Sequence, residues 1–470
     1  MLKLKHLQFI YYIGFILCFF TTFVIYFIKN TNFNIPVGAV IWIGLPVLLL
    51  YEKTTSLLLF YKNLFKYPIA KTYIIMILYV SVSIIVHACL GQYTAPSTFY
   101  ATKFLRAFCI SVGLYFFVPL GVYLKINIKN LTKLFYLCIF LIFIIAIIEY
   151  FVKNFNIVPI YKILDFLSNQ RYSMYGYMHD GLGDTLRCRA LFAEPSELGQ
   201  FIFITMPFVI NFKYIKEPII KNNIIRFITK KSILFIMIIA LIMTESPIYF
   251  ILCLIELLIL HLITYRKYLG VILFFSFIVL SVGAIILNSD TNISDTFLNR
   301  IIITKDCLGS FDNLVVYEPS LASRISSYAT QLVIFKQHFV FGVGFWNVCG
   351  YLGNKLLAIS PLPLTQELIM GYFRKSDVVG VNFSLIYTSM AEFGLVGIFF
   401  YIIYFYRNLK FLNIIKNKLK NQDYYFILSL LQSCIMVVIL GFYNLTIGSM
   451  FIPIIFSLVL FTNIYYIRYK

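Results

Sequence analysis

Long apolar runs recur from one end of the chain to the other. A transmembrane helix needs about 20 consecutive, mostly apolar residues. Runs that approach or reach this length lie at 9–28, 37–51, 72–90, 104–124, 134–152, 194–212, 232–244, 247–263, 269–287, 384–405, 425–441 and 450–467. A bilayer also requires each backbone N–H and C=O to be paired within its own segment, which favours helices. The sequence therefore predicts an all-α integral membrane protein with twelve or so transmembrane helices.

Positive charges are concentrated in alternate connections between these runs. With both termini placed on one side, that side holds 24 of the 39 Lys and Arg residues and only three acidic residues. Short loops rich in Lys and Arg stay in the cytoplasm. We therefore expect both termini to be cytoplasmic. These loops account for the net charge of +20, so no basic patch remains to suggest nucleic acid as a partner.

This topology leaves two long extracytoplasmic loop segments. We expect five transmembrane helices in 1–152, a first outer loop at 153–193, four helices in 194–287, a large outer loop at 288–383 and three helices in 384–470. The second loop is long enough for a small subdomain outside the membrane. A chain this apolar is expected to place its chemistry in these loops and at the helix ends beside them.

Two arginines and two glutamates lie within eleven residues at the outer start of the sixth run. If 187–189 is extended, Arg187 and Arg189 point the same way, and paired guanidiniums can clamp a phosphate or diphosphate. Pro195 suits the first position of a helix, which would make Glu194 its N-cap. Glu194 and Glu197 either complement the helix dipole, or one of them accepts a proton from a sugar hydroxyl.

The first outer loop contains a polar, aromatic stretch between Ser168 and Gly183. Tyrosine rings can stack on the apolar faces of sugars, and carboxylates accept hydrogen bonds from sugar hydroxyls. This pattern suggests sugar-binding residues, and the candidates are Arg171, Tyr172, Tyr175 and Asp180. The alternative is an aromatic belt at the membrane interface.

The second outer loop contains an amphipathic run that begins at Arg324 and reaches about Phe339. Its apolar residues recur at helical spacing, and Gly342-Val343-Gly344 predicts where the helix stops. A continuous helix would place Arg324 and His338 about 21 Å apart, so both cannot contact one phosphate. Arg324 is either a diphosphate ligand or a surface arginine, and His338 either a base or an exposed loop histidine. Arg374 either snorkels or meets a diphosphate.

The tenth run contains an acidic residue, Glu392, with Gly394 and Gly397 beside it. A buried carboxylate in a membrane needs a polar partner, so we expect Glu392 to join helices. Glycines three residues apart permit close contact between helices. We therefore expect close contact with another helix at this point.

Several motifs, in this order, resemble the O-antigen polymerase and ligase superfamily. The first is Arg189-x4-Glu194-Pro195-Ser196-Glu197-Leu198-Gly199. Ser323-Arg324 then opens the amphipathic run, which ends in His338-Phe339-Val340-Phe341-Gly342-Val343-Gly344-Phe345. The last two are Asn382-Phe383-Ser384-Leu385 and Ala391-Glu392-Phe393-Gly394-Leu395-Val396-Gly397. Together with the two outer loops, they make 187–400 similar to these bacterial membrane enzymes.

The resemblance implies a glycosyltransferase at the outer face of the bacterial inner membrane. Its donor would be a glycan linked to undecaprenyl diphosphate, and its product an O-antigen, capsule or exopolysaccharide. The resemblance also implies that Arg187 or Arg189, together with Arg324, binds the diphosphate. Two departures matter: Val381 stands where a histidine often precedes Asn382, and Phe339 where a proline often follows the histidine. The first weighs against a ligase and favours a polymerase.

The reaction needs cations for the diphosphate and a base for the acceptor hydroxyl. We expect Glu194 or Glu197, or else His338, to be the base. No metal or other cofactor is expected, because arginines could supply the counter-charge. The bilayer is a partner, and a chain-length regulator protein could be another. The alternatives are an O-antigen ligase and a polysaccharide flippase or transporter, although transporters often show internal repeats.

Overall fold

The structure is a computed structural model of the chain. It describes 4–19, 24–26, 34–90, 97–155, 188–190, 195–212, 223–244, 249–256, 319–345, 384–419, 422–443 and 451–469, with a few isolated residues between these ranges. The first five helices are α1 (Leu4–Leu17), α2 (Val37–Leu64), α3 (Pro68–Cys89), α4 (Ser97–Tyr123) and α5 (Ile128–Asn154). The later ones are α8 (Pro195–Asn211), α9 (Asn223–Met243), α14 (Pro319–Gln337), α17 (Leu385–Lys418), α18 (Gln422–Tyr443) and α19 (Phe451–Tyr469).

The predicted helical character is confirmed for the described residues. Five described helices are long and apolar enough to cross a membrane, namely α2, α3, α5, α17 and α18. Shorter apolar helices lie within α1, α4, α9 and α19. These helices indicate a multi-pass membrane protein. The predicted run at 269–287 lies outside the described residues.

The first predicted run, 9–28, is wrong in its second half. Helix α1 already ends at Leu17, and Val24–Tyr26 forms strand β1. It pairs antiparallel with β2 (Asn34–Pro36), with Val24 opposite Pro36. The residues of β1 are β-branched or aromatic, types that favour extended backbone, so hydrophobicity alone misjudged the length of the helix.

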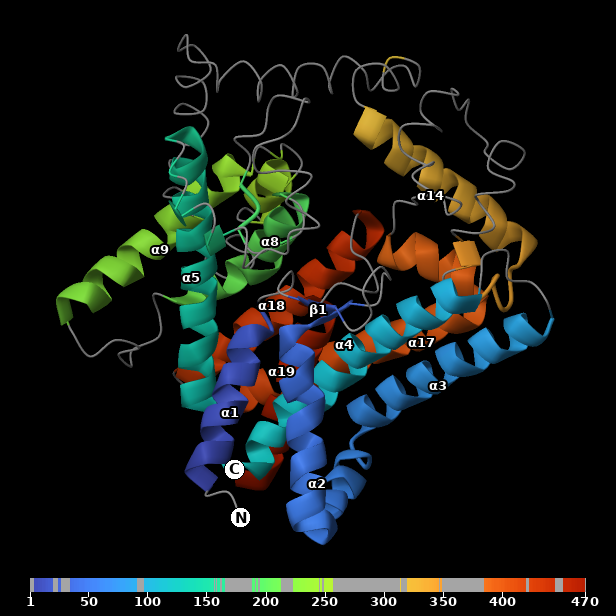
Figure 1. The fold of residues 1–470 in the computed structure, drawn as a ribbon, viewed down its shortest axis with the longest axis horizontal. Helices are drawn as coiled ribbons and strands as arrows, with labels where there is room; N and C mark the ends of the chain where they lie inside the picture. Colours follow the sequence, from blue (N-terminus) through green and yellow to red (C-terminus); the bar gives the residue numbers. More distant parts are fainter. Residues whose placement is uncertain are drawn as a thin grey trace.

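Helix α19 lies at the centre of the bundle, between α4 and α18 (Figure 1). Its inner residues, such as Leu458 and Phe461, are fully buried. Both termini lie at the same end of the molecule (Figure 1), and the Gln8 side chain donates to the carbonyl of Leu124 there, at 2.9 Å. Shared placement of the termini agrees with an even number of crossings.

Polar side chains join α8 to α18 inside the bundle. The buried amide of Asn211 donates to Ser429 Oγ at 3.0 Å and to Gln432 Oε1 at 2.9 Å. Ser433 donates to the carbonyl of Ile204 at 2.6 Å. Such bonds hold helices together in a medium where apolar contact alone gives little preference. They fix the position of α8, whose first turn borders the candidate site.

Helix α17 is broken at Gly394, which has φ 62° and ψ −158°. The turn after α14 fills this break. Val343 N–H and Gly344 N–H donate to the carbonyls of Ala391 and Glu392, both at 2.9 Å. In return, Leu395 N–H donates to the carbonyl of Phe339 at 2.8 Å. The close contact at Gly394 is therefore made by the turn after α14, because a Cβ there would meet Val340 and Phe341.

The break also contacts α3. Tyr79 donates to the carbonyl of Phe393 at 2.9 Å, and His87 Nε2 lies 3.3 Å from the carbonyl oxygen of Gly342. Non-helical backbone is tolerated at membrane depth only where protein or water satisfies its polar groups. The turn after α14 is thus packed between α3 and α17, and α14 is anchored to the bundle.

Candidate functional site

A buried carboxylate holds the segment that precedes α8. Glu149, near the end of α5, is fully buried. Its Oε2 accepts hydrogen bonds from the backbone N–H groups of Arg189, at 3.0 Å, and Ala190, at 2.6 Å. Ala190 has φ 53°, which is uncommon for a residue with a side chain. The carboxylate therefore stabilises a local conformation that the sequence disfavours.

Glu149 also pairs with a lysine one turn later. Lys153 Nζ lies 3.0 Å from Glu149 Oε1, and the lysine side chain is only 7% exposed. Arg189 is 4% exposed. We call Glu149, Lys153 and Arg189 the Glu149 cluster. The cluster therefore buries two cationic side chains and one carboxylate at the end of the bundle opposite the termini.

Neighbouring helices tie down the same segment. Cys188 N–H donates to the carbonyl of Met243, the last residue of α9, at 2.8 Å. The ring of Phe192 packs on Phe201 of α8, with centroids 5.3 Å apart. The Glu149 cluster thus sits where the ends of α5 and α9 meet the start of α8.

Helix α8 begins at Pro195, as predicted. Glu197 lies in its first turn and is half-buried. An acid at this position complements the partial positive charge of the helix start. Glu197 also follows Arg189 by only eight residues in the chain, so it remains a candidate for the base as well.

Arg324 lies on α14, which packs against the first half of α17. Gln331 accepts a hydrogen bond from Thr388 at 3.1 Å, and the rings of Tyr328 and Tyr387 stack with centroids 5.2 Å apart. Arg324 is half-buried. Below it, the face of α14 is rich in buried hydroxyl and amide groups, contributed by Ser326, Ser327, Thr330 and Gln331.

His338 follows the end of α14 and is half-buried. Its backbone N–H donates to the carbonyl of Ile334 at 2.9 Å, and its backbone carbonyl accepts from Gly342 N–H at 2.9 Å. It therefore begins the turn that fills the break in α17. This position differs from a histidine on a solvated loop, because Gly342 and Gly344 next to it are packed against α17 and α3.

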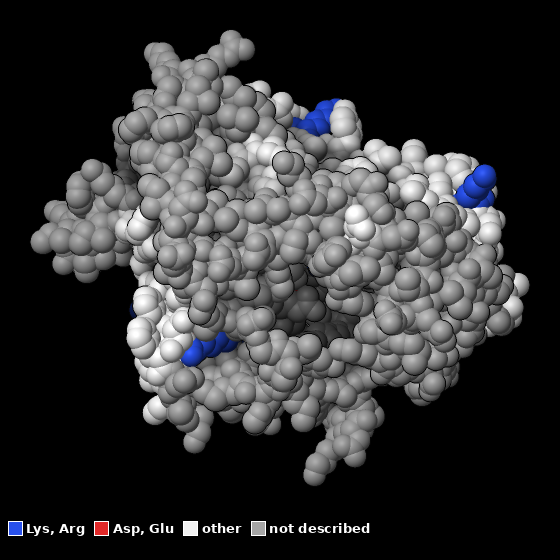
Figure 2. Space-filling model, turned by 90° about the horizontal axis from the view of Figure 1, so that it is seen from above, with Lys and Arg blue, Asp and Glu red and all other residues white. Residues whose placement is uncertain are grey.

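The candidate residues fall into two groups. The Glu149 cluster belongs to α5 and the α8 entry, whereas Arg324 and His338 belong to α14, which lies on the opposite side of the upper part of the molecule (Figure 1). On the upper face itself, the described Lys and Arg residues show only at scattered points (Figure 2). The predicted residues outside the described ones are Arg171, Tyr172, Tyr175, Asp180, Arg187, Glu194 and Arg374.

Sequence reasoning missed Glu149 and Lys153. The available signal was a Glu and a Lys four residues apart at the outer end of an apolar run, since charge at membrane depth is costly and usually retained for a reason. Among the residues that the structure describes, no three His, Cys, Asp or Glu side chains gather as metal ligands. The charged side chains with which the Glu149 cluster could bind an anionic ligand are Lys153 and Arg189.

Residues 232–402 match the protein family described as O-antigen ligase. The match covers a little over a third of the chain and includes Arg324, His338 and Glu392, but not the Glu149 cluster. No curated protein matches the chain. The family covers O-antigen ligases and polymerases, glycosyltransferase-like membrane enzymes that act on lipid-linked glycans. With the order of motifs and the helical bundle, this match supports a similarity of 232–402 to the O-antigen ligase and polymerase superfamily.

Proposed function

We propose that the protein polymerises oligosaccharide repeat units carried on undecaprenyl diphosphate, at the outer face of the bacterial inner membrane. It would move the growing chain from its lipid diphosphate onto the non-reducing sugar of an incoming lipid-linked repeat unit. The observation that supports this most is the pair of cationic side chains, Lys153 and Arg189, buried beside the start of α8. Charged side chains at membrane depth are costly and are usually retained for function.

The departing group explains why a cation is needed. In the transfer, an acceptor hydroxyl oxygen bonds to the anomeric carbon while that carbon separates from a diphosphate oxygen. Negative charge therefore grows on the diphosphate, and fixed cations beside it stabilise the transition state. Arg189 offers a bidentate contact, and Lys153 offers a point charge. Glu149 pairs with Lys153 and accepts a hydrogen bond from the backbone N–H of Arg189, so it helps to position both residues.

The placement of Arg324 favours a polymerase over a ligase. A polymerase must hold two lipid diphosphates at once, one for the donor and one for the acceptor. A ligase that transfers to another kind of acceptor needs only one. Arg324 lies on α14, apart from the helices that carry the Glu149 cluster (Figure 1). We therefore assign the cluster and Arg324 to separate diphosphates, and holding both substrates together supplies much of the rate enhancement.

The proton of the acceptor hydroxyl must pass to a base. Glu197 at the start of α8 and His338 at the end of α14 are the described candidates, and Glu194 is a third. Arg171, Tyr172, Tyr175 and Asp180 remain our proposed sugar contacts, and Arg187 and Arg374 our further proposed diphosphate contacts. The base is the side chain whose removal lowers turnover while substrate binding persists.

The test replaces one arginine of each group and reads the length of the surface glycan. We expect Arg189→Ala and Arg324→Ala to leave mainly single repeat units on the surface, at normal protein level. Arg189→Lys should fail as well if the contact is bidentate. Lys336→Gln is the matched control, because Lys336 is exposed on the last turn of α14 and the same charge is lost.

Normal long chains in either arginine variant would refute its assignment to a diphosphate. Loss of all surface glycan, including single units, would indicate the ligase alternative. The transporter alternative predicts that purified protein in proteoliposomes transfers no glycan when both lipid-linked substrates already face the correct side. Elongation in that assay would exclude a function limited to transport.

A further inference from the structure

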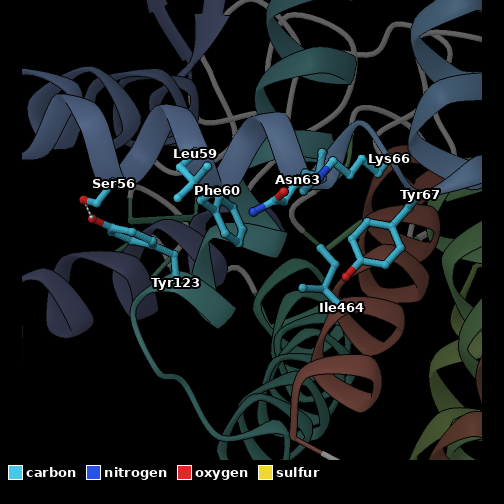
Figure 3. A pocket seen from close by; sticks show the side chains of 9 residues that line it. Ser56, Leu59, Phe60, Asn63, Lys66, Tyr67, Tyr123 and Ile464 are labelled. Atoms are coloured by element: carbon cyan, nitrogen blue, oxygen red, sulfur yellow. Dashed lines mark hydrogen bonds between the residues drawn. The ribbon is translucent and has the colours of Figure 1, made fainter.

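A cavity of about 690 Å³ opens at the end of the molecule that carries the termini. Its lining comes from the second half of α2, the turn that follows it, the end of α4 and α19 (Figure 3). The lining residues are Ser56, Leu59, Phe60, Asn63, Leu64, Lys66, Tyr67, Tyr123 and Ile464. This end lies far along the helices from the Glu149 cluster, and the proposed polymerase function does not use it.

The cavity separates polar from apolar groups. Ser56 and Tyr123 meet at one end through a 2.7 Å hydrogen bond. Asn63, Lys66 and Tyr67 lie toward the other end, and Phe60 stands between (Figure 3). Most of the wall is carbon, as in sites for amphipathic ligands, where a few polar groups fix orientation.

The charge of the cavity has one sign. Lys66 lines it and is exposed, and none of the nine lining residues is acidic. The distribution of Lys and Arg along the sequence predicts that this end faces the cytoplasm. Anionic lipids give the cytoplasmic leaflet a negative surface potential, and basic pockets between helices on that side bind lipid head groups.

The walls of the cavity continue into surface suited to lipid chains. Leu59, which lines the cavity, is 57% exposed, and Leu58 and Phe65, each next in the chain to a lining residue, are 54% and 44% exposed. Helix α2 is broken at Lys53, which has φ −141° and ψ 46°, so its second half is a separate piece that packs beside α4. An amphipathic molecule could therefore enter from the bilayer and join this piece to α4 and α19.

We propose that this cavity binds one anionic phospholipid of the cytoplasmic leaflet. Its phosphate would contact Lys66, with Asn63 and Tyr67 as hydrogen-bond partners. Its glycerol and first methylene groups would lie against Phe60, Leu64 and Ile464. A soluble anion of the cytoplasm could use the lysine but would leave the apolar wall uncovered.

The test uses the full-length protein in phosphatidylcholine nanodiscs, titrated with phosphatidylglycerol and followed by native mass spectrometry. We expect one saturable phosphatidylglycerol. Lys66→Gln should weaken this binding about fivefold, since one lysine near an anionic lipid contributes about 1 kcal/mol. Asn63→Asp should weaken phosphatidylglycerol binding more than Lys66→Gln does, because the new carboxylate repels the phosphate. Lys62→Gln is the matched control, because Lys62 is exposed on the last turn of α2, four residues before Lys66, but does not line the cavity, and we expect binding within about twofold of wild type.

Three results would overturn the proposal. Equal losses in Lys62→Gln and Lys66→Gln would mean diffuse attraction to the surface. Equal occupancy by added phosphatidylcholine would remove the need for a negative charge. Competition by glycerol phosphate, without acyl chains, would mark a site for soluble anions. None of these outcomes bears on the polymerase proposal, which is tested by the length of the surface glycan.

Discussion

At the scale of single residues, Glu149 is the group on which the candidate site depends. One carboxylate oxygen accepts two backbone N–H groups and the other pairs with Lys153. This arrangement keeps Ala190 in its left-handed conformation and places Arg189 at the junction of three helices. We therefore propose that Glu149 is a positioning residue, acting through Arg189 and Lys153.

Glu149→Gln tests this role. An amide keeps one oxygen for the two N–H donors but turns an N–H₂ group toward Lys153, so the ion pair with the buried lysine is lost. We expect the protein to lose about 1–3 kcal/mol of stability and to make mainly single repeat units. Thermal unfolding of the purified protein and the glycan profile of cells are the two measurements.

A double-mutant cycle separates positioning from general destabilisation. Lys153→Met in the Glu149→Gln background should cost less than the sum of the two single changes, because each already breaks the same pair. Strictly additive losses would show that Glu149 and Lys153 act independently. Normal glycan length in Glu149→Gln would remove its positioning role altogether.

At the scale of elements, the break in α17 joins the two outer parts of the chain. The backbone bonds between the break and the turn after α14 fix that turn in depth and direction. Arg324 and His338 therefore take their positions from a site inside the bundle. The family match spans both sides of this junction.

Gly394→Ala should disrupt the junction. A Cβ at Gly394 would lie 2.4 Å from the carbonyl oxygen of Val340, and its φ of 62° is strained for any side chain. We expect a loss of about 1–3 kcal/mol with a shorter glycan, measured as above. Gly44→Ala is the control, because a Cβ there meets nothing within 4 Å and alanine favours the helix. Equal thermal stability of the two variants would contradict the proposed importance of the break.

At the scale of the whole molecule, the bundle separates two chemically different ends. The end opposite the termini carries the Glu149 cluster, and the other end carries the Lys66 cavity. The charge distribution of the loops predicts which end faces the cytoplasm. Both proposals depend on this orientation, so it can be tested independently of either.

The described free cysteines provide the test of orientation. Cys89, at the end of α3, is exposed, whereas Cys18, Cys138, Cys188, Cys253 and Cys434 are buried. In a variant with Cys307→Ser and Cys349→Ser, we expect a membrane-impermeant thiol reagent to label Cys89 from outside intact spheroplasts. Cys89→Ser in that variant is the control and should abolish labelling. Labelling of Cys89 only after lysis would reverse the assigned orientation and move the candidate site to the cytoplasm.

The sequence by itself determined the helical type of most described elements. A long apolar run in a bilayer has few options besides a helix, so the runs from α2 to α5 and from α17 to α19 were predicted as helices, and Pro195 was correctly predicted to start α8. The arginine and histidine candidates were also visible, because charge is rare in such a chain. The early end of α1 was not visible, since β-branched residues are as hydrophobic as those of the helix before them.

Only the tertiary structure decided what the charged and glycine residues do. Glu149 contacts Arg189 and Ala190, forty residues away in the chain, and Gly394 admits a turn from residues 339–344. Neither contact leaves a local pattern, because a buried carboxylate and a buried glycine look the same in sequence whatever segment they meet. The physical reason is that buried carboxylates and glycines take their roles from residues that are distant in the sequence. The length of an apolar helix, in contrast, is set by the thickness of the bilayer and can be read from consecutive residues.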